Sequence, residues 1–226
     1  LSADKPGFIR INNISGDTTF STIVAGGAIT LASAANTLSF GVSSQAITGL
    51  AGDAGQASGL VSITAASVNI VKSIVTAGGN VSITSTSGAI TASAGADITT
   101  TATANTGTTS GSVAIVGASH VTLNNITTTG AANDQAAGSN AATVNVSSTA
   151  GDVSVFAITT SGGQPMRVDS GGSGLDNGGN AASITLSSST GRKTVLRGNL
   201  TAIGGNFSGT SAAAQGLGGN ILTTGP

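Results

Sequence analysis

The chain has 226 residues, of which 7% are charged and 2% are aromatic, and its formal net charge is −1. This balance offers no basic surface for nucleic acid, and the absence of cysteine excludes disulfides and thiolate metal sites. Hydrophobic residues make up 38%, and the larger ones are mainly Val and Ile, which together with abundant Thr favour strands. The composition therefore predicts an all-β fold and argues against disorder.

Segments that direct a chain to or through a membrane are not recognisable. No apolar run approaches the roughly 18 residues of a membrane-spanning helix, so none is predicted. Residues 1–7 lack a positive segment followed by an apolar one, so no signal peptide is recognised. We expect that a leader has been removed or that the chain is an excerpt from a longer protein.

An alternating apolar motif recurs along the chain at intervals of about 20 residues or, with insertions, about 31 to 40 residues. Each copy alternates apolar with small or polar residues, which predicts a strand with one buried face. The copies are Ile29-Thr30-Leu31, Val61-Ser62-Ile63, Val81-Ser82-Ile83, Val113-Ala114-Ile115, Val144-Asn145-Val146 and Ile184-Thr185-Leu186.

Two further short strands follow each copy. The second strands are predicted to open at Leu38, Val68, Ile90, Val121, Val153 and Val195. The third strands carry one apolar residue each, at Ile47, Ile74, Ile98, Ile126, Ile158 and Leu200. Threonine follows that residue at Thr48, Thr99, Thr127, Thr159 and Thr201, and Val75 is the exception.

The Gly/Ala/Ser/Asn-rich insertions all fall after a third strand, at residues 50–59, 101–111, 131–140, 162–180 and 206–219. Three short strands per repeat leave no room for a helical crossover. We therefore predict one domain over residues 1–226. Its fold is a three-sided parallel β-helix, right-handed as the commoner form, with about seven to eight coils and its insertions at one corner.

Residues at equivalent places in the repeats should stack along the axis. We expect apolar columns in the interior, among them Ile74, Ile98, Ile126, Ile158 and Leu200. Asn80, Asn140, Asn180 and Asn220 each begin a coil, and the last three are evenly spaced, so we expect them to form a ladder of side chains. The five Phe residues are interpreted as core residues. These are Phe8, Phe20, Phe40, Phe156 and Phe207.

No catalytic site is predicted. Glycoside cleavage needs two carboxylates held close together on a rigid face, whereas the Asp residues are spread along the chain and His120 is the sole histidine. Residues 171–176 match the start of a calcium-binding repeat, which makes Asp169 and Asp176 candidate calcium ligands. The alternative is a glycine-rich loop, because only one copy is present and Gly178 occupies the apolar position. No other cofactor is expected.

The segment Gly79-Asn80-Val81-Ser82-Ile83-Thr84-Ser85-Thr86-Ser87-Gly88-Ala89-Ile90-Thr91 resembles the shaft repeats of filamentous-haemagglutinin-like adhesins and of autotransporter passengers. The resemblance covers roughly residues 8–224. It implies an elongated, extracellular protein of the bacterial cell surface with a non-catalytic shaft. No polar repeat caps the C-terminal end, so we expect that the chain continues or that copies stack end to end.

The principal hypothesis is a structural module that provides a rigid rod with loops for lateral or surface contacts, including host or matrix glycans. Arg192, Lys193 and Arg197 form a basic cluster that either docks an acidic partner or glycan or is simply solvated. The alternative is a carbohydrate-binding or carbohydrate-cleaving β-helix, although Trp and Tyr platforms for sugars are absent. Ice binding by the outward Thr column is weaker still, because the column is interrupted at Val75 and lacks a Thr-x-Thr array.

Overall fold

The computed structural model describes residues 2–3, 9–11, 16–20, 23–25, 28–40, 47–49, 59–134, 137–165, 177–206 and 215–224. All regular structure in these residues is β-strand, and none of them is helical. The strands form one 19-stranded network in which every strand pairing is parallel. The fold is all-β with an extensive parallel sheet, as predicted, and it is compatible with a β-helix.

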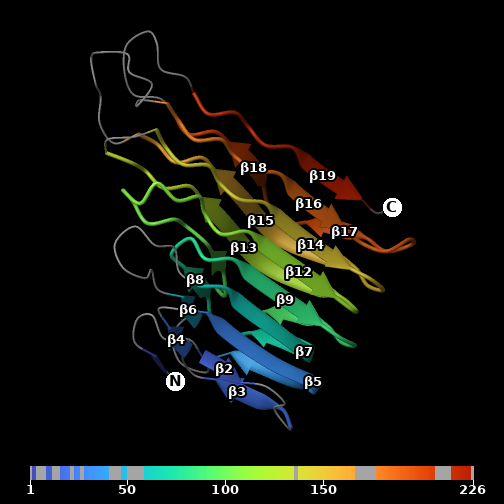
Figure 1. Ribbon diagram of the computed structural model, residues 1–226. Coiled ribbons are helices and arrows are strands. Elements are labelled where there is room, and N and C mark those ends of the chain that lie inside the picture. The colour runs from blue at the N-terminus through green and yellow to red at the C-terminus, as the bar shows by residue number, and fades with distance from the viewer. Residues whose placement is uncertain are drawn as a thin grey trace.

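Parallel pairing sorts the strands into three columns. The first column contains the predicted first strands, and Figure 1 shows them one above another from the N-terminal to the C-terminal end. Along this column Ile29, Val61, Val81, Val113, Val144 and Ile184 are successive partners. Its members are β2 (Ile9–Ile11), the first part of β5 (Ile29–Phe40), the first part of β7 (Val61–Ile70), β9 (Val81–Ser85), β12 (Val113–Gly117), β14 (Val144–Ser148), β16 (Ile184–Ser187) and β19 (Ile221–Thr224).

The second column contains the predicted second strands, with one correction. Leu38, Val68, Ile90, Val121 and Val153 are successive partners, but the next partner is Thr194 rather than Val195. Val195 pairs with Ser154 and is 40% exposed. The members are β3 (Thr18–Phe20), the second parts of β5 and β7, β10 (Ile90–Ala92), the first parts of β13 (Val121–Thr129) and β15 (Val153–Ser161), and β17 (Thr194–Leu196).

The third column aligns Ile47, Ile74, Ile98, Ile126, Ile158 and Leu200 as successive partners. The members are β1 (Ser2–Ala3), β4 (Ile23–Ala25), β6 (Ile47–Gly49), β8 (Ile74–Thr76), β11 (Ile98–Thr99), the second parts of β13 and β15, and β18 (Leu200–Ile203). One strand of each column, taken in chain order, is called a rung below.

Burial alternates along the strands and defines the interior. In β9 the side chains of Val81 and Ile83 are buried while Ser82 and Thr84 between them are half-buried. Each fully buried Val, Ile or Leu contributes roughly 1.5–3 kcal/mol, and nearly every rung adds several of them to one continuous apolar cluster. Phe156 departs from the predicted core role. It follows inward Val155 and so faces outward, 48% exposed.

The long connections run from the third column to the first column of the next rung. They comprise residues 50–60, 100–112, 130–143, 162–183 and 204–220, whereas β8 and β9 are joined by residues 77–80 alone. In Figure 1 the described parts of residues 100–112 and 130–143 lie on the side opposite the labels of β9, β12 and β14. Connections between the other columns are short, as at 118–120 and 71–73. Among the described residues there is no helix that is long and apolar enough to cross a membrane.

Candidate functional site

Side chains at the corners hold neighbouring rungs together. At the start of a parallel strand, the first backbone N–H points toward the neighbouring strand of the preceding rung. That neighbouring strand has not yet begun at this point, so it offers no backbone carbonyl to accept the hydrogen bond. Before the third column, Ser73 Oγ accepts this bond from Asp97 N at 3.1 Å, and Asp97 Oδ1 accepts it from Asn125 N at 3.2 Å. The corner side chain therefore replaces the missing backbone acceptor.

The same arrangement before the second column involves His120 and two further carboxylates. Asp17 Oδ1 accepts from Thr37 N at 2.9 Å, and Asp152 Oδ1 accepts from Lys193 N at 2.8 Å. His120 Nδ1 accepts from Asp152 N at 3.1 Å and lies 3.6 Å from Asp152 Oδ2. These polar side chains satisfy backbone groups one at a time. Within the described residues no three His, Asp or Glu side chains come together as a metal site.

The four predicted Asn residues lie in two columns rather than one ladder. Asn80 and Asn220 both directly precede a first-column strand, where their carbonyl groups accept from Val61 N and Ile184 N. Asn140 and Asn180 lie three residues earlier in their repeats. Asn140 Oδ1 accepts from Asn180 N at 2.7 Å, and Asn180 Oδ1 accepts from Leu217 N at 2.8 Å.

The prediction of a single Asn ladder was wrong because residues that are evenly spaced in the sequence need not occupy equivalent positions in successive rungs. Asn140 and Asn180 are 40 residues apart and do stack, but the next repeat is shorter, and the partner of Asn180 is Leu217, 37 residues on. The side chains also bond to the backbone of the next rung instead of to each other. The length of each connection, which varies, sets the local period.

Where the structure describes them, the long connections leave and return as extended legs that stack on those of neighbouring rungs. In the outgoing legs, Gly130 N donates to Ser161 O and Asn133 N to Gln164 O. In the return legs, Gly138 N donates to Asn177 O and Ala141 N to Asn180 O. Both pairs of donors are three residues apart, which matches the three residues per turn of polyproline II. Backbone bonding in the legs thus follows a different period from that in the strands.

Outgoing and return legs are also joined to each other through their backbones. Gly163 N donates to Ser139 O at 2.8 Å, Gly179 N to Gly163 O at 2.9 Å, and Gly205 N to Gly179 O at 2.7 Å. A Cβ on Gly163 would overlap the carbonyl of Ala131, although the φ of Gly163 is not left-handed. Glycine is needed here because the backbones approach closely.

Four buried threonines close the base of the legs, and sequence reasoning missed them. Each lies two residues after a third-column isoleucine and is at most 1% exposed. Thr128 Oγ1, for example, donates to Ala142 O at 3.0 Å, which lies just before the next first-column strand. The signal was an Ile-x-Thr motif with a polar residue at an inward position. The threonines and their acceptors are Thr76 with Gly79, Thr100 with Gly111, Thr128 with Ala142 and Thr160 with Ala182.

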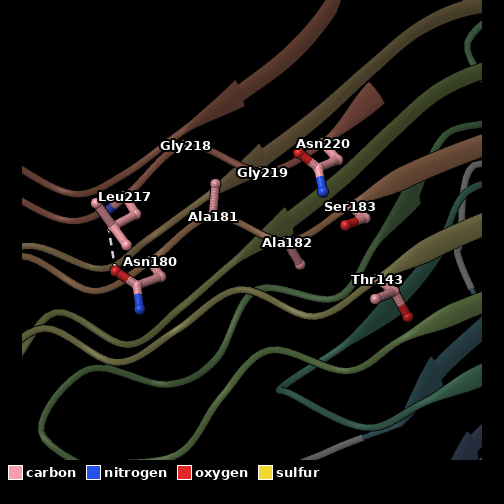
Figure 2. A pocket seen from close by; sticks show the side chains of 9 residues that line it. All are labelled: Thr143, Asn180, Ala181, Ala182, Ser183, Leu217, Gly218, Gly219 and Asn220. Carbon is pink, nitrogen blue, oxygen red and sulfur yellow. Dashed lines mark hydrogen bonds between the residues drawn. The ribbon is translucent and has the colours of Figure 1, made fainter. Parts of the chain in front are cut away.

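A shallow trough lies on the return legs (Figure 2). One rim carries Asn180 and Leu217, and Figure 2 shows the hydrogen bond between them. The other rim carries Thr143, Ser183 and Asn220, which succeed one another from rung to rung because each directly precedes a first-column strand. Between the rims lies a floor of Ala181, Ala182, Gly218 and Gly219.

The chemistry of the trough is neutral and polar. Its rims offer amides and hydroxyls, and the residues that line it in the described part of the chain include no charged or aromatic side chain. The Asn180 oxygen is engaged by Leu217 N, so the amide nitrogen is the group directed away from the backbone. Two of the Asn residues singled out in the sequence, Asn180 and Asn220, thus meet at this site.

The third face carries a second outward Thr/Ser column beside the first, so the predicted lack of a Thr-x-Thr array is wrong. Thr127 pairs with Thr159, and two residues on Thr129 pairs with Ser161. Ala102 N donates to Thr129 O, which continues the alignment to Thr101. A Thr-x-Thr or Thr-x-Ser array therefore spans neighbouring rungs. Ice binding remains a hypothesis that a thermal-hysteresis measurement would test.

The remaining candidates are placed as follows. Asp169 and Asp176, with the glycine-rich segment 171–176, lie outside the described residues. Arg192 and Lys193 lie exposed immediately before β17 and Arg197 immediately after it, where its guanidinium donates to Leu123 O at 3.0 Å. In comparisons with known proteins, no family model, no curated protein and no solved structure matches this chain.

Proposed function

We propose that this chain is a right-handed, three-sided parallel β-helix of about seven to eight coils that serves as the shaft of a bacterial extracellular filament or adhesin. The observation that carries the proposal is the joint regularity of strands and connections. All three columns pair in parallel, and the long connections leave from one column only. Such a chain makes a rod whose extra segments project along one ridge.

The contacts between rungs support a mechanical role. Continuous parallel ladders are reinforced at the corners by side-chain acceptors such as Asp97 and at the base of the legs by buried threonines such as Thr128. The legs add their own backbone bonds from rung to rung. A load along the axis is then shared among many short hydrogen bonds. We propose a non-catalytic role, because the carboxylates of Asp17, Asp97 and Asp152 each accept a backbone N–H.

Electron microscopy tests the rod and the ridge together. At about 4.8 Å per coil, this chain should form a particle roughly 35 Å long along its axis. One epitope tag inserted near residue 135 and another near residue 210 should place bound antibody fragments on the same edge. A tag in the turn at residues 149–151 should place the fragment on another edge. Fragments from the first two tags on different edges, or a two-sheet sandwich in an experimental map, would overturn the proposal.

A further inference from the structure

The trough on the return legs presents hydrogen-bond donors in a fixed orientation. Asn180 lines the trough, and Asn140 lies one rung earlier on the same return legs, just outside the residues that line it. Both are exposed, and each side-chain oxygen accepts a backbone N–H from the next rung. Their amide nitrogens are consequently held as outward donors at successive rungs, about 4.8 Å apart along the axis. The opposite rim adds the hydroxyls of Thr143 and Ser183. The result is two parallel rows of neutral polar groups over a flat Ala/Gly floor.

The backbone hydrogen bonds and the neutral lining of the trough argue against two classes of extended polymer, peptides and nucleic acids. In the floor Ala181 N donates to Leu217 O, and one rung earlier Ala141 N donates to Asn180 O, both at 2.8 Å, so these N–H groups are not available to pair with a peptide strand. Peptide recognition by strand addition depends on such free backbone groups. The lack of charge along the trough also removes the electrostatic attraction that nucleic acids and anionic polymers need.

We propose that the return-leg trough binds an extended, uncharged, hydroxyl-rich glycan. Sugar hydroxyls and ring oxygens accept from the Asn amides and exchange hydrogen bonds with the Thr and Ser hydroxyls, while the flat floor lets a pyranose ring lie close. Without aromatic stacking each rung binds weakly, and repetition along the axis raises the avidity. This proposal deepens the shaft proposal, on which it rests for the repetition of the trough along a rod.

The sharpest variant is the double substitution Asn140→Asp and Asn180→Asp. A carboxylate keeps the oxygen that accepts from Asn180 N and Leu217 N, but it cannot donate, so the contacts between rungs survive and the outward donors are lost. Asn199→Asp is the matched control, because Asn199 is exposed at the corner before β18, away from the trough. Calorimetry or NMR titration would use the whole chain and neutral linear hexasaccharides of the cello-, manno- and chito- series.

We expect at least one neutral hexasaccharide to bind the parent chain and Asn199→Asp equally, and the double variant about tenfold more weakly, the loss of two ordinary hydrogen bonds. If the double variant fails to fold, Thr143→Val with Ser183→Ala removes the opposite rim and should weaken binding similarly. The proposal is overturned if no neutral hexasaccharide binds at millimolar concentration or if neither pair of substitutions changes the affinity. It is equally overturned if a Gly/Ser-rich peptide, and no glycan, depends on these residues. Electron microscopy tests the rod shape independently of glycan binding. A failure to bind glycan would therefore overturn the trough proposal without affecting the shaft proposal.

Discussion

The strand columns and the stacked legs both join successive rungs, but they do so through different interactions. In the columns, rungs join through parallel ladders, and specificity comes from side chains that alternate between an apolar interior and a polar exterior. In the legs, rungs join through single backbone bonds every third residue, and glycine lets the chains approach. The columns depend on the presence of side chains, whereas the legs depend on their absence.

This contrast explains how one corner accommodates connections of very different length. Each buried threonine and the carbonyl that accepts its hydrogen bond, together called a clasp, lie on the two sides of a connection. The hydrogen bond therefore closes the base of the legs whatever the length of the chain between them. Thr76 reaches Gly79 three residues away, and Thr160 reaches Ala182 22 residues away. Sequence length can therefore vary outside the clasp without displacing the next strand.

Removing side-chain volume from a column should cause the largest loss of stability. Ile126 is 1% exposed and is flanked by Ile98 and Ile158 in the same column. Ile126→Ala should lower the free energy of unfolding by about 2–5 kcal/mol, and Ile126→Val by about 0.5–1.5 kcal/mol. Denaturant unfolding followed by circular dichroism measures both. Equal and small losses would mean that the column does not pack as a continuous core.

Adding volume to a leg should have the next largest effect, and it should be local. Gly163→Ala places a Cβ against the carbonyl of Ala131, which no rotamer change can relieve, and should cost about 1–3 kcal/mol. Gly218→Ala is the matched control, since its Cβ would meet only Ala202 O at 3.1 Å. Hydrogen exchange should accelerate in residues 130–141 and 162–165 of the first variant while β13 and β15 stay protected. Uniform acceleration along the chain would contradict the separation of legs from columns.

Sequence reasoning anticipated the parts of the fold that depend on side-chain alternation. The alternation of Val81 and Ile83 with polar residues predicts a half-buried strand. Equivalent apolar pairs in the neighbouring repeats are their partners in the first column. It failed by one residue at Thr194, where an apolar Val195 beside a polar Thr194 suggested the wrong inward position. Alternation fixes the period of a strand, but a single apolar residue does not fix its phase.

The candidate site was much less predictable, for a physical reason. Return legs are held by backbone groups, which every residue possesses, so a three-residue period leaves little trace in a Gly/Ala/Asn sequence. Asn180 and Asn220 were noticed for their spacing, yet their meeting at the trough depends on the length of one connection. The buried Thr128 was readable as a polar residue at an inward position, but its acceptor lies beyond an insertion.

Opening a clasp should cost less than disturbing a leg. Thr128→Val keeps the shape of the side chain but leaves the carbonyl of half-buried Ala142 without its hydroxyl donor, so we expect a loss of about 1–2 kcal/mol. Thr127→Val, one residue earlier and facing outward, should change stability by no more than about 0.5 kcal/mol. Thermal unfolding of both variants provides the measurement. An equal effect of the two would show that the clasp carries no stabilisation.

The smallest effect should come from removing charge at a corner while keeping the acceptor. Asp97 Oδ1 accepts from both the backbone and the side-chain nitrogen of Asn125, at 3.2 and 3.1 Å. Asp97→Asn retains an oxygen in that place and should alter the free energy of unfolding by less than about 0.5 kcal/mol, whereas Asp97→Ala should cost about 1 kcal/mol. Measuring the free energy of unfolding at low and at high salt separates the contribution of the Asp97 charge from that of its hydrogen bonds. If Asp97→Asn proved as costly as Asp97→Ala, and salt reduced the difference from the parent chain, the corner would act through its charge. Corner and leg would then differ in electrostatics as well as in backbone contacts.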